Sequence, residues 1–460
     1  MSDLVSQLAA LIGIECVTED PQILESHGLD WTRFYEPCPS AVVFPRSIPA
    51  LQKIVLFALD QKIALVPSGG RTGLSGGAVA KDGEIVVSFD KMNEIGAYDE
   101  VEQTVEVEAG VVTQVLQDFA KSHGLQYPVD FASAGSSQIG GNIATNAGGI
   151  KVLRYGLTRD WIQGLTVVTG QGEVLELNKG LIKNATGYDL RHLFIGSEGT
   201  LGFIAKAKVQ LTSAPINPEV LLLAVNQMTD AIKVLSKFRE SLNLTAFEFF
   251  SELALQHVIK ERDTIHPFAE ASSFYVLLEF ENSSEQAMES SMSCFEVCVT
   301  EGWVNDGVVS QSEAQRAELW AYREAISESI TPFTPYKNDV SVGIARVPEF
   351  LNRVEAIVNE SYPEFEIVWF GHIGDGNVHL NILKPDSWLV ADFKQECEKV
   401  SQQVMALVAE FGGSVSAEHG VGLLKRDQLG FSRSREEIAA MRAIKQVFDP
   451  AGIMNPGKLL

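Results

Sequence analysis

Short runs of apolar residues, separated by polar residues and glycines, predict a mixed fold of helices and strands. In the first half of the chain these runs are rich in valine and isoleucine, as strands are. Helical spacing of apolar residues predicts helices over 48–61 and 112–123, and Gly124 follows the second as a typical helix end. The predicted strands are 41–44, 64–67, 85–88, 104–108, 165–169 and 204–211.

The pattern changes after residues 212–218, a segment with two prolines that predicts a linker. Beyond it, strands and helices alternate in a way that indicates an α+β domain built on an antiparallel sheet. Apolar residues at helical spacing near the N-terminus predict one further packed helix. The predicted strands are 220–225 and 274–281, and the predicted helices are 228–242, 284–302, 392–411 and 435–448.

Length and charge narrow the class of protein. A chain of 460 residues is too long for a single core, so two or more domains are expected. The net charge of −24 argues against a nucleic-acid or anionic-membrane partner, which would need a basic face. No apolar run approaches the roughly 18 residues of a membrane span, and the N-terminus lacks the basic start of a signal peptide. The five scattered cysteines suit buried thiols, so we expect a cytoplasmic protein.

Two dense clusters of glycine suggest a phosphate-bearing ligand. Residues 67–77 hold five glycines and two serines directly after a predicted buried strand. A second cluster, 133–142, leads into the glycine-containing stretch 144–149. Glycines let the backbone approach a ligand, and successive N–H groups form an anion cradle, so two such loops suit a pyrophosphate held from both sides. Mobile surface loops are the alternative, and neither cluster matches the G-x-G-x-x-G fingerprint.

A candidate metal site lies in the stretch 370–381. Asp375-Gly376 is typical of a two-residue hairpin turn, and apolar residues flank it on both sides. Such a turn would place His372 directly opposite His379, with Cβ atoms roughly 4.5–5.5 Å apart on one face. Two imidazoles at that spacing can share one metal ion. Asn381 follows two residues beyond His379 and therefore points to the same face.

These motifs together resemble a known flavoprotein superfamily. The glycine loop 69–73, the loop 139–142 and the segment 196–202 are similar to the FAD domain of the vanillyl-alcohol oxidase/p-cresol methylhydroxylase superfamily. Segments 371–377 and 416–420 resemble its D-2-hydroxyacid dehydrogenase branch, which includes D-lactate, glycolate and D-2-hydroxyglutarate dehydrogenases. The similarity extends from about Pro39 to the C-terminus.

The resemblance implies an α+β fold with three parts. Residues 1–214 are expected to form a two-subdomain FAD-binding domain of the p-cresol methylhydroxylase type, with an N-terminal helix. Residues 215–420 would form a ferredoxin-like substrate- and metal-binding domain on an antiparallel sheet. Residues 421–460 would be a helical segment that returns to the FAD domain.

The resemblance also implies a bound FAD, with its pyrophosphate on the glycine loops. Relatives with a covalent flavin often carry histidine just after the Gly-Gly of the first loop, whereas this chain carries Arg71, so non-covalent FAD is expected. The residues expected at FAD are Pro67, Ser68, Gly69, Gly70, Arg71, Thr72, Gly73, Ser75, Gly76, Ser133, Gly135, Ser136, Gly140, Gly141, Asn142, Asn146, Gly149, Glu198, Ile204 and Asn455.

A catalytic metal site needs three protein ligands and an open position. By resemblance, Glu418 joins His372 and His379 as the third ligand, and His419 is the base beside the substrate hydroxyl. Glycines follow at positions 420 and 422 and would bend the backbone so that neighbouring side chains serve one pocket. The ligand set suits zinc first, with Mn²⁺ or Fe²⁺ as alternatives.

A third stretch carries candidate substrate ligands. Arg323 and Ser327 are four residues apart on a predicted helix and would share a face. With Lys337 they match the residues that hold the substrate carboxylates in D-2-hydroxyglutarate enzymes, except that the usual hydroxyl residue there is threonine. Asn381 and His419 complete the expected substrate set. The alternative is a surface helix with an ordinary salt bridge at Arg323.

The expected activity is oxidation of a D-2-hydroxy acid, with D-2-hydroxyglutarate first, to the 2-oxo acid. The resemblance implies proton abstraction and hydride transfer to flavin N5, with an electron-transfer flavoprotein or a quinone as acceptor. D-lactate, glycolate or D-malate are alternative substrates, and a homodimer is compatible with the family. A flavin relay subunit without its own substrate, or a non-enzymatic zinc protein, are the alternatives from other classes.

Overall fold

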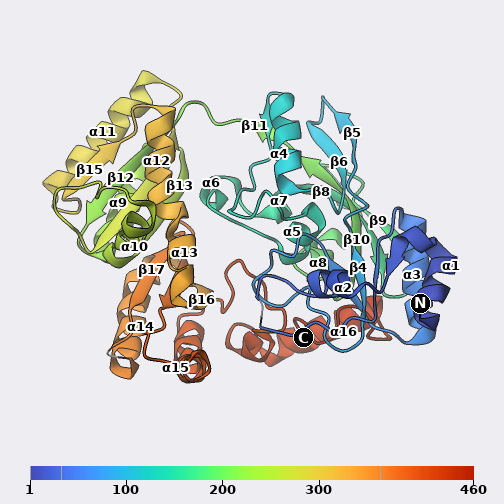
Figure 1. The fold of residues 1–460 in the computed structure, drawn as a ribbon. Helices are drawn as coiled ribbons and strands as arrows, with labels where there is room; N and C mark the ends of the chain where they lie inside the picture. The colour runs from blue at the N-terminus through green and yellow to red at the C-terminus, as the bar shows by residue number, and fades with distance from the viewer. Residues whose placement is uncertain (1, 33, 363) are drawn as a thin grey trace. The chain divides into compact units, whose positions relative to one another are not determined.

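The computed structural model describes residues 2–32, 34–362 and 364–460, which form two compact units (Figure 1). The first unit comprises Met1–Gly148, Gly156–Ala214 and Glu418–Leu460. The second comprises Gly149–Tyr155 and Pro215–Ala417, so the short segment 149–155, expected in the first domain, groups with the second. Mixed helix and antiparallel sheet confirm the α+β prediction. None of the described helices is long and apolar enough to cross a membrane.

Two main sheets organise the first unit. In the four-stranded sheet, the order is β1-β2-β4-β3, and β2, β4 and β3 run parallel. The five-stranded sheet has the order β5-β6-β10-β8-β9 and is antiparallel throughout. A small third sheet pairs β11 with β7. The strands are β1 (Val17–Thr18), β2 (Ala41–Val43), β3 (Leu65–Ser68), β4 (Ile85–Ser88), β5 (Ile95–Asp99), β6 (Thr104–Glu108), β7 (Leu125–Gln126), β8 (Ile162–Thr169), β9 (Val174–Leu177), β10 (Gly202–Gln210) and β11 (Thr212–Ser213).

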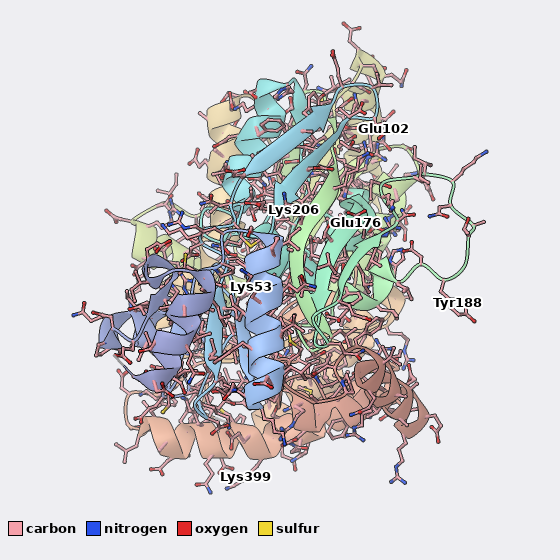
Figure 2. The ribbon with its side chains drawn as sticks, turned by 90° about the vertical axis from the view of Figure 1, so that its right-hand side faces the viewer. Lys53, Glu102, Glu176, Tyr188, Lys206 and Lys399 are labelled. Carbon is pink, nitrogen blue, oxygen red and sulfur yellow. The ribbon has the colours of Figure 1, made fainter. Side chains whose placement is uncertain are left out.

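The burial of these strands explains their sequences. Strands β2 and β4 are buried at every position, which is why they are apolar except for the final Ser88 of β4, as expected for parallel strands covered on both faces. The helices of this unit are α1 (Asp3–Ile12), α2 (Pro21–His27), α3 (Ile48–Gln61), α4 (Thr113–Ser122), α5 (Ile139–Thr145), α7 (Thr158–Trp161), α8 (Arg191–Phe194) and α16 (Arg435–Phe448). Between β9 and α8 a loop stands out from the sheet, and Tyr188 on it is 95% exposed (Figure 2).

The second unit is built on one seven-stranded sheet with the order β15-β12-β14-β13-β17-β18-β16. Every neighbouring pair is antiparallel. The strands are β12 (Pro218–Val225), β13 (Leu244–Ser251), β14 (Phe274–Glu281), β15 (Asp306–Val309), β16 (Tyr336–Ser341), β17 (Ile367–Gly371) and β18 (Asn377–Ile382). The helices are α6 (Val152–Tyr155), α9 (Met228–Arg239), α10 (Glu252–Arg262), α11 (Glu285–Thr300), α12 (Glu313–Glu324), α13 (Ile326–Ser329), α14 (Val347–Ser361) and α15 (Val390–Glu410).

Both faces of this sheet are covered, so its central strands are mostly apolar. Val220 and Leu222 of β12 lie in one buried cluster with residues of α10 and α12. Leu223 points to the opposite face, where Phe295 of α11 also packs against β15. The same cluster on the first face includes Ile150, which ties the inserted segment 149–155 to this core.

The C-terminal tail is fixed to the first unit by a buried carboxylate. Asp449 is fully buried and accepts hydrogen bonds from Ile453 N–H and Met454 N–H, each at 3.0 Å. Lys445 Nζ lies 2.7 Å from its Oδ2. The tail then pairs with β3, because Leu65 N–H donates to the carbonyl of Ile453 at 2.8 Å.

Replacing Asp449 by alanine should therefore destabilise the first unit by about 3 kcal/mol, since two backbone N–H groups lose their acceptor and the partly buried Lys445 loses its charged partner. Urea unfolding followed by circular dichroism measures the change. Asp427→Ala is the matched control, because that side chain is 88% exposed and forms an ion pair with its neighbour Arg426 at the surface. An unchanged midpoint for Asp449→Ala would contradict the anchoring role.

Candidate functional site

A pocket in the first unit is walled by the two glycine clusters. They touch backbone to backbone: a Cβ added at Gly70 would lie 2.2 Å from the carbonyl oxygen of Ser136. At Gly140 an added Cβ would lie 2.6 Å from Cβ of Ala109. Only glycine fits at these two positions. The pocket wall is therefore backbone for much of its length, which suits a ligand that is bound through N–H groups.

Polar side chains complete this wall. Gln138 is buried, and its Oε1 accepts no hydrogen bond within the described residues, so it is available to a ligand donor. Its Nε2 donates to Asp90 at 2.8 Å. Burial acts to raise the pKa of Asp90, but hydrogen bonds from His27 and Gln138 and the charge of Arg71 outweigh it and lower the pKa to about 2. The carboxylate thus stays charged and holds both Gln138 and Arg71.

Twelve of the expected FAD residues line this pocket, and eight do not. Those that line it are Pro67, Gly69, Gly70, Arg71, Thr72, Gly73, Ser75, Gly140, Gly141, Asn142, Glu198 and Ile204. Those that do not are Ser68, Gly76, Ser133, Gly135, Ser136, Asn146, Gly149 and Asn455. Gly149 belongs to the segment that groups with the second unit. Lining residues that the sequence analysis missed include Asp30, Phe89, Ala109 and Gln138.

His419 also lines the pocket, on a segment that Glu198 holds. Glu198 is buried and accepts hydrogen bonds from Val421 N–H at 2.8 Å and Gly422 N–H at 2.7 Å. Burial raises its pKa in spite of these two donors. Ser75 Oγ donates to the carbonyl of His419 at 2.8 Å.

The bend that carries His419 depends on glycine. Gly420 and Gly422 have φ angles of +79° and +51°, which is the backbone bend expected at these positions. A Cβ on Gly422 would lie 2.1 Å from the carbonyl oxygen of Ser75. Asn455 Nδ2 donates to the backbone carbonyl of Glu198 at 2.7 Å, so it supports the wall from behind.

The hairpin of the second unit has a different register from the predicted one. Strands β17 and β18 pair Phe370, not His372, with His379. The prediction of a two-residue turn at Asp375-Gly376 was wrong, because the loop runs over residues 372–376. Gly374 N–H donates to the carbonyl of Phe247 at 3.0 Å, which draws this loop onto β13. The two imidazoles nevertheless converge, with ring centroids 5.5 Å apart.

Glu248 on β13 joins this site and was not foreseen. It is 1% exposed, and its Oε1 lies 2.9 Å from Nδ1 of His372. Its Oε2 lies 2.8 Å from Nη2 of Arg323, which is itself buried. Burial acts to raise the pKa of Glu248, but His372 and Arg323 lower it more. A single acidic residue inside the apolar run 244–251 was the available signal, since a buried charge requires a partner.

The second histidine also lies beside a carboxylate. Asp339 of β16 is the direct cross-strand partner of His379, and its Oδ1 lies 3.8 Å from His379 Nδ1. Asn377 Nδ2 donates to the same Oδ1 at 2.8 Å. The ring of His379 packs on Phe370, with centroids 4.9 Å apart. Both imidazoles are therefore buried beside acidic oxygens on one side of the ring.

The expected substrate ligands are arranged differently from the prediction. Arg323 and Ser327 do not lie on one uninterrupted helix, because α12 ends at Glu324 and α13 begins at Ile326. Arg323 is buried, whereas Ser327 is exposed. Lys337 of β16 and Asn381 of β18 are direct cross-strand partners, so their side chains share a face. The surface-helix alternative for Arg323 does not hold, because its partner Glu248 lies on a buried strand.

Two family models match the chain. The FAD binding domain matches residues 39–178, and the C-terminal domain of FAD linked oxidases matches residues 214–459. A D-2-hydroxyglutarate dehydrogenase of Stutzerimonas stutzeri is 56% identical over 99% of this chain and 98% of that protein. One of Xanthomonas citri is 51% identical over 96% of this chain and 93% of that protein.

Solved structures agree on the fold. The structure of p-cresol methylhydroxylase superposes with a TM-score of 0.77 at 16% identity, covering 99% of this chain and 96% of that one. Alkyldihydroxyacetonephosphate synthase gives a TM-score of 0.75 at 17% identity, with 99% and 84% covered. With these matches over nearly its whole length, the chain belongs to the FAD-linked oxidase family, in the branch that holds the D-2-hydroxyglutarate dehydrogenases.

Proposed function

We propose that this protein is an FAD- and divalent-metal-dependent dehydrogenase that oxidises D-2-hydroxyglutarate to the 2-oxo acid. The observation that carries the proposal is the buried convergence of His372, His379, Glu248 and Arg323, which places two imidazoles beside a cation suited to a carboxylate. The similar dehydrogenases at 51% and 56% identity support the substrate. A relative named putative D-lactate dehydrogenase, at 35% identity, supports D-lactate as the second candidate.

The pocket of the first unit would hold FAD through the glycine loops and Gln138. Bound FAD supplies the acceptor for the hydride that leaves C2 of the substrate. The cofactor is held without a covalent bond, because Arg71 stands where linked relatives carry histidine. The Arg71 guanidinium donates to the carbonyl of Gly69 at 2.9 Å, which folds the side chain back on its own loop.

The residues that would hold the metal are His372, His379 and Glu418. The fit rests on the donor set: each imidazole has its Nδ1 towards a carboxylate, which directs Nε2 to a metal, and one carboxylate completes a common catalytic set. Zn²⁺ is the first choice, with Mn²⁺ or Fe²⁺ as alternatives. Such an ion lowers the pKa of a hydroxyl that binds it.

His419 takes the hydroxyl proton of the substrate. Its backbone is fixed on both sides, by Ser75 at its own carbonyl and by Glu198 at the two residues that follow the bend. A base held in this way loses little orientational freedom on reaction. Imidazole suits the role because its unperturbed pKa lies close to neutrality.

Arg323 would bind a substrate carboxylate. Its Nη2 is committed to Glu248, but its buried Nε donates no hydrogen bond within the described residues. An unsatisfied buried donor costs about 1–3 kcal/mol, which a substrate carboxylate would recover. Lys337 and Asn381, which are cross-strand partners, would bind the remaining carboxylate oxygens of the substrate. Ser327, four residues after Arg323, would contribute its hydroxyl. An electron-transfer flavoprotein or a quinone would be the electron acceptor.

The proposed function predicts a metal-dependent flavin reduction. Under anaerobic conditions, D-2-hydroxyglutarate should bleach the absorbance band of the oxidised flavin at ~450 nm. After chelation, or in His379→Ala, the bleaching should stop while FAD stays bound, because the two sites are separate in the sequence. Rapid-scan absorbance with and without added Zn²⁺ or Mn²⁺ measures this. Full bleaching of metal-free protein would remove the metal from the proposal.

Cofactor binding should depend on Gly70. In Gly70→Ala the new methyl group would push the two glycine loops apart at Ser136, so FAD should be lost on gel filtration. The ratio of flavin absorbance to protein absorbance measures the loss. Gly430→Ala is the control, since apart from its chain neighbours no atom of the described residues lies within 4 Å of an added Cβ there. Retention of FAD by Gly70→Ala would show that the loops are not in contact.

Substrate choice should depend on Arg323. Arg323→Ala should reduce kcat/KM for D-2-hydroxyglutarate and D-malate by about one to two decades, because a charge-assisted hydrogen bond worth roughly 1.5–3 kcal/mol is lost. D-lactate, with one carboxylate, should be affected much less. Steady-state kinetics on the three acids, for wild type and variant, measure the difference. An equal loss on all three would assign Arg323 to the C1 carboxylate.

A further inference from the structure

We propose that Glu248 is a positioning residue that fixes the ring of His372 for metal binding and at the same time holds Arg323 for the substrate carboxylate. This inference rests on the proposed function and deepens it. It makes one buried carboxylate the link between the metal ligand and the substrate cation. Glu248 contacts both partners at once, because both of its oxygens lie within 2.9 Å of His372 Nδ1 and Oε2 also lies 2.8 Å from Arg323 Nη2.

The geometry that carries this inference lies within the second unit. Glu248 Oε1 and Oε2 lie 2.9 Å and 2.8 Å from His372 Nδ1, and Oε2 also lies 2.8 Å from Arg323 Nη2. The Glu248 side chain is 1% exposed, and those of His372 and Arg323 are 9% and 7% exposed. The guanidinium of Arg323 also lies over the ring of Phe370, 4.8 Å from its centroid. Little water can therefore replace either partner.

The carboxylate determines which nitrogen of His372 carries the proton. A carboxylate only accepts hydrogen bonds, so Nδ1 of a neutral ring must be the protonated nitrogen. Nε2 then carries the lone pair that a metal needs. Arg323, which is always charged, lies 2.8 Å from Oε2 and so helps to hold the carboxylate against His372.

Glutamine at position 248 would reverse this assignment. An amide has one accepting oxygen and one donating NH₂ group, so it can accept from only one of the two partners. The charged Arg323 would take the oxygen, since charge-assisted hydrogen bonds are the stronger ones. The NH₂ group would then face Nδ1 of His372 and make it an acceptor, which moves the ring proton to Nε2. The nitrogen meant for the metal would be blocked.

The same sheet provides a matched control in Glu279 of β14. This carboxylate is 5% exposed and accepts from Lys151 Nζ at 2.7 Å and from Trp320 Nε1 at 3.0 Å. Trp320 and Arg323 lie three residues apart on α12, so the helix contacts the sheet through both carboxylates. Glu279 shares burial, charge and helix with Glu248 but touches neither histidine in the described structure.

The test measures metal affinity directly on metal-free holo-flavoprotein. Zn²⁺ alone, and Mn²⁺ alone, are titrated in competition with a chelator of known affinity. Glu248→Gln should bind Zn²⁺ about 10–100-fold more weakly than wild type, the range typical for loss of a ligand's hydrogen-bond partner. Its KM for D-2-hydroxyglutarate should rise as well. Glu279→Gln should keep the wild-type affinity.

The outcomes distinguish failure of the metal in the proposed function from failure of the role of Glu248. If wild type binds neither ion, the metal of the proposed function fails, and the role of Glu248 fails with it. If wild type binds the metal and Glu248→Gln binds it equally well, the inference fails while the proposed function stands. Equal weakening in Glu279→Gln would show a general effect of the sheet and would also overturn the inference.

A second variant covers the case in which Glu248→Gln does not fold. Glu248→Leu with Arg323→Met removes both buried charges together, and such replacements are often neutral or stabilising. The double variant also leaves His372 without its carboxylate, so its Zn²⁺ affinity should fall by the same 10–100-fold. Wild-type affinity in a folded double variant would overturn the inference.

Discussion

The hydrogen-bonded pairing of buried Glu248 is the constraint on which the candidate site depends. A charged carboxylate that is 1% exposed is tolerated only when donors replace the water it has lost. Breaking such a group's pairing costs about 3–5 kcal/mol. The requirement fixes α12, which carries Arg323, and the loop 372–376, which carries His372, to the same strand. The paired carboxylate of Glu248 therefore both packs α12 against the sheet and orients His372, the proposed metal ligand.

The first unit uses a second buried carboxylate in the same way. Glu198 accepts hydrogen bonds from the backbone N–H groups of Val421 and Gly422. It thereby holds a segment that lies 223 residues further along the chain, counted to Val421. Asn455, from the tail, fixes the backbone of Glu198 in turn. Without these bonds, the glycine-bent segment that carries His419, the proposed base, would be mobile. Some acidic residues of the chain are therefore buried and hold backbone segments in place, while others lie on the solvated surface.

The sequence predicted the regular elements well where the signal is local. The ranges 48–61, 85–88, 104–108, 274–281 and 435–448 agree with α3, β4, β6, β14 and α16 at both ends. Each is bounded by turn residues and carries an uninterrupted apolar pattern, which depends only on neighbours in the chain. The α+β class and the antiparallel second sheet follow from those patterns. The family resemblance added what periodicity does not contain, namely the expectation of an FAD-binding domain followed by a C-terminal domain of the FAD linked oxidases.

What the sequence did not predict depends on partners far away in the chain. The turn at Asp375-Gly376 has the residues of a two-residue hairpin, but the hydrogen bond from Gly374 to Phe247 selects a longer loop and shifts the register by two. Glu248 and His372 are 124 residues apart, so no spacing rule connects them. A strand of apolar residues that contains one glutamate nevertheless carries information, because burial of that charge demands a cation or a donor nearby. A lone glutamate in an apolar strand is therefore a candidate partner for a histidine whose ring orientation cannot be predicted from the sequence.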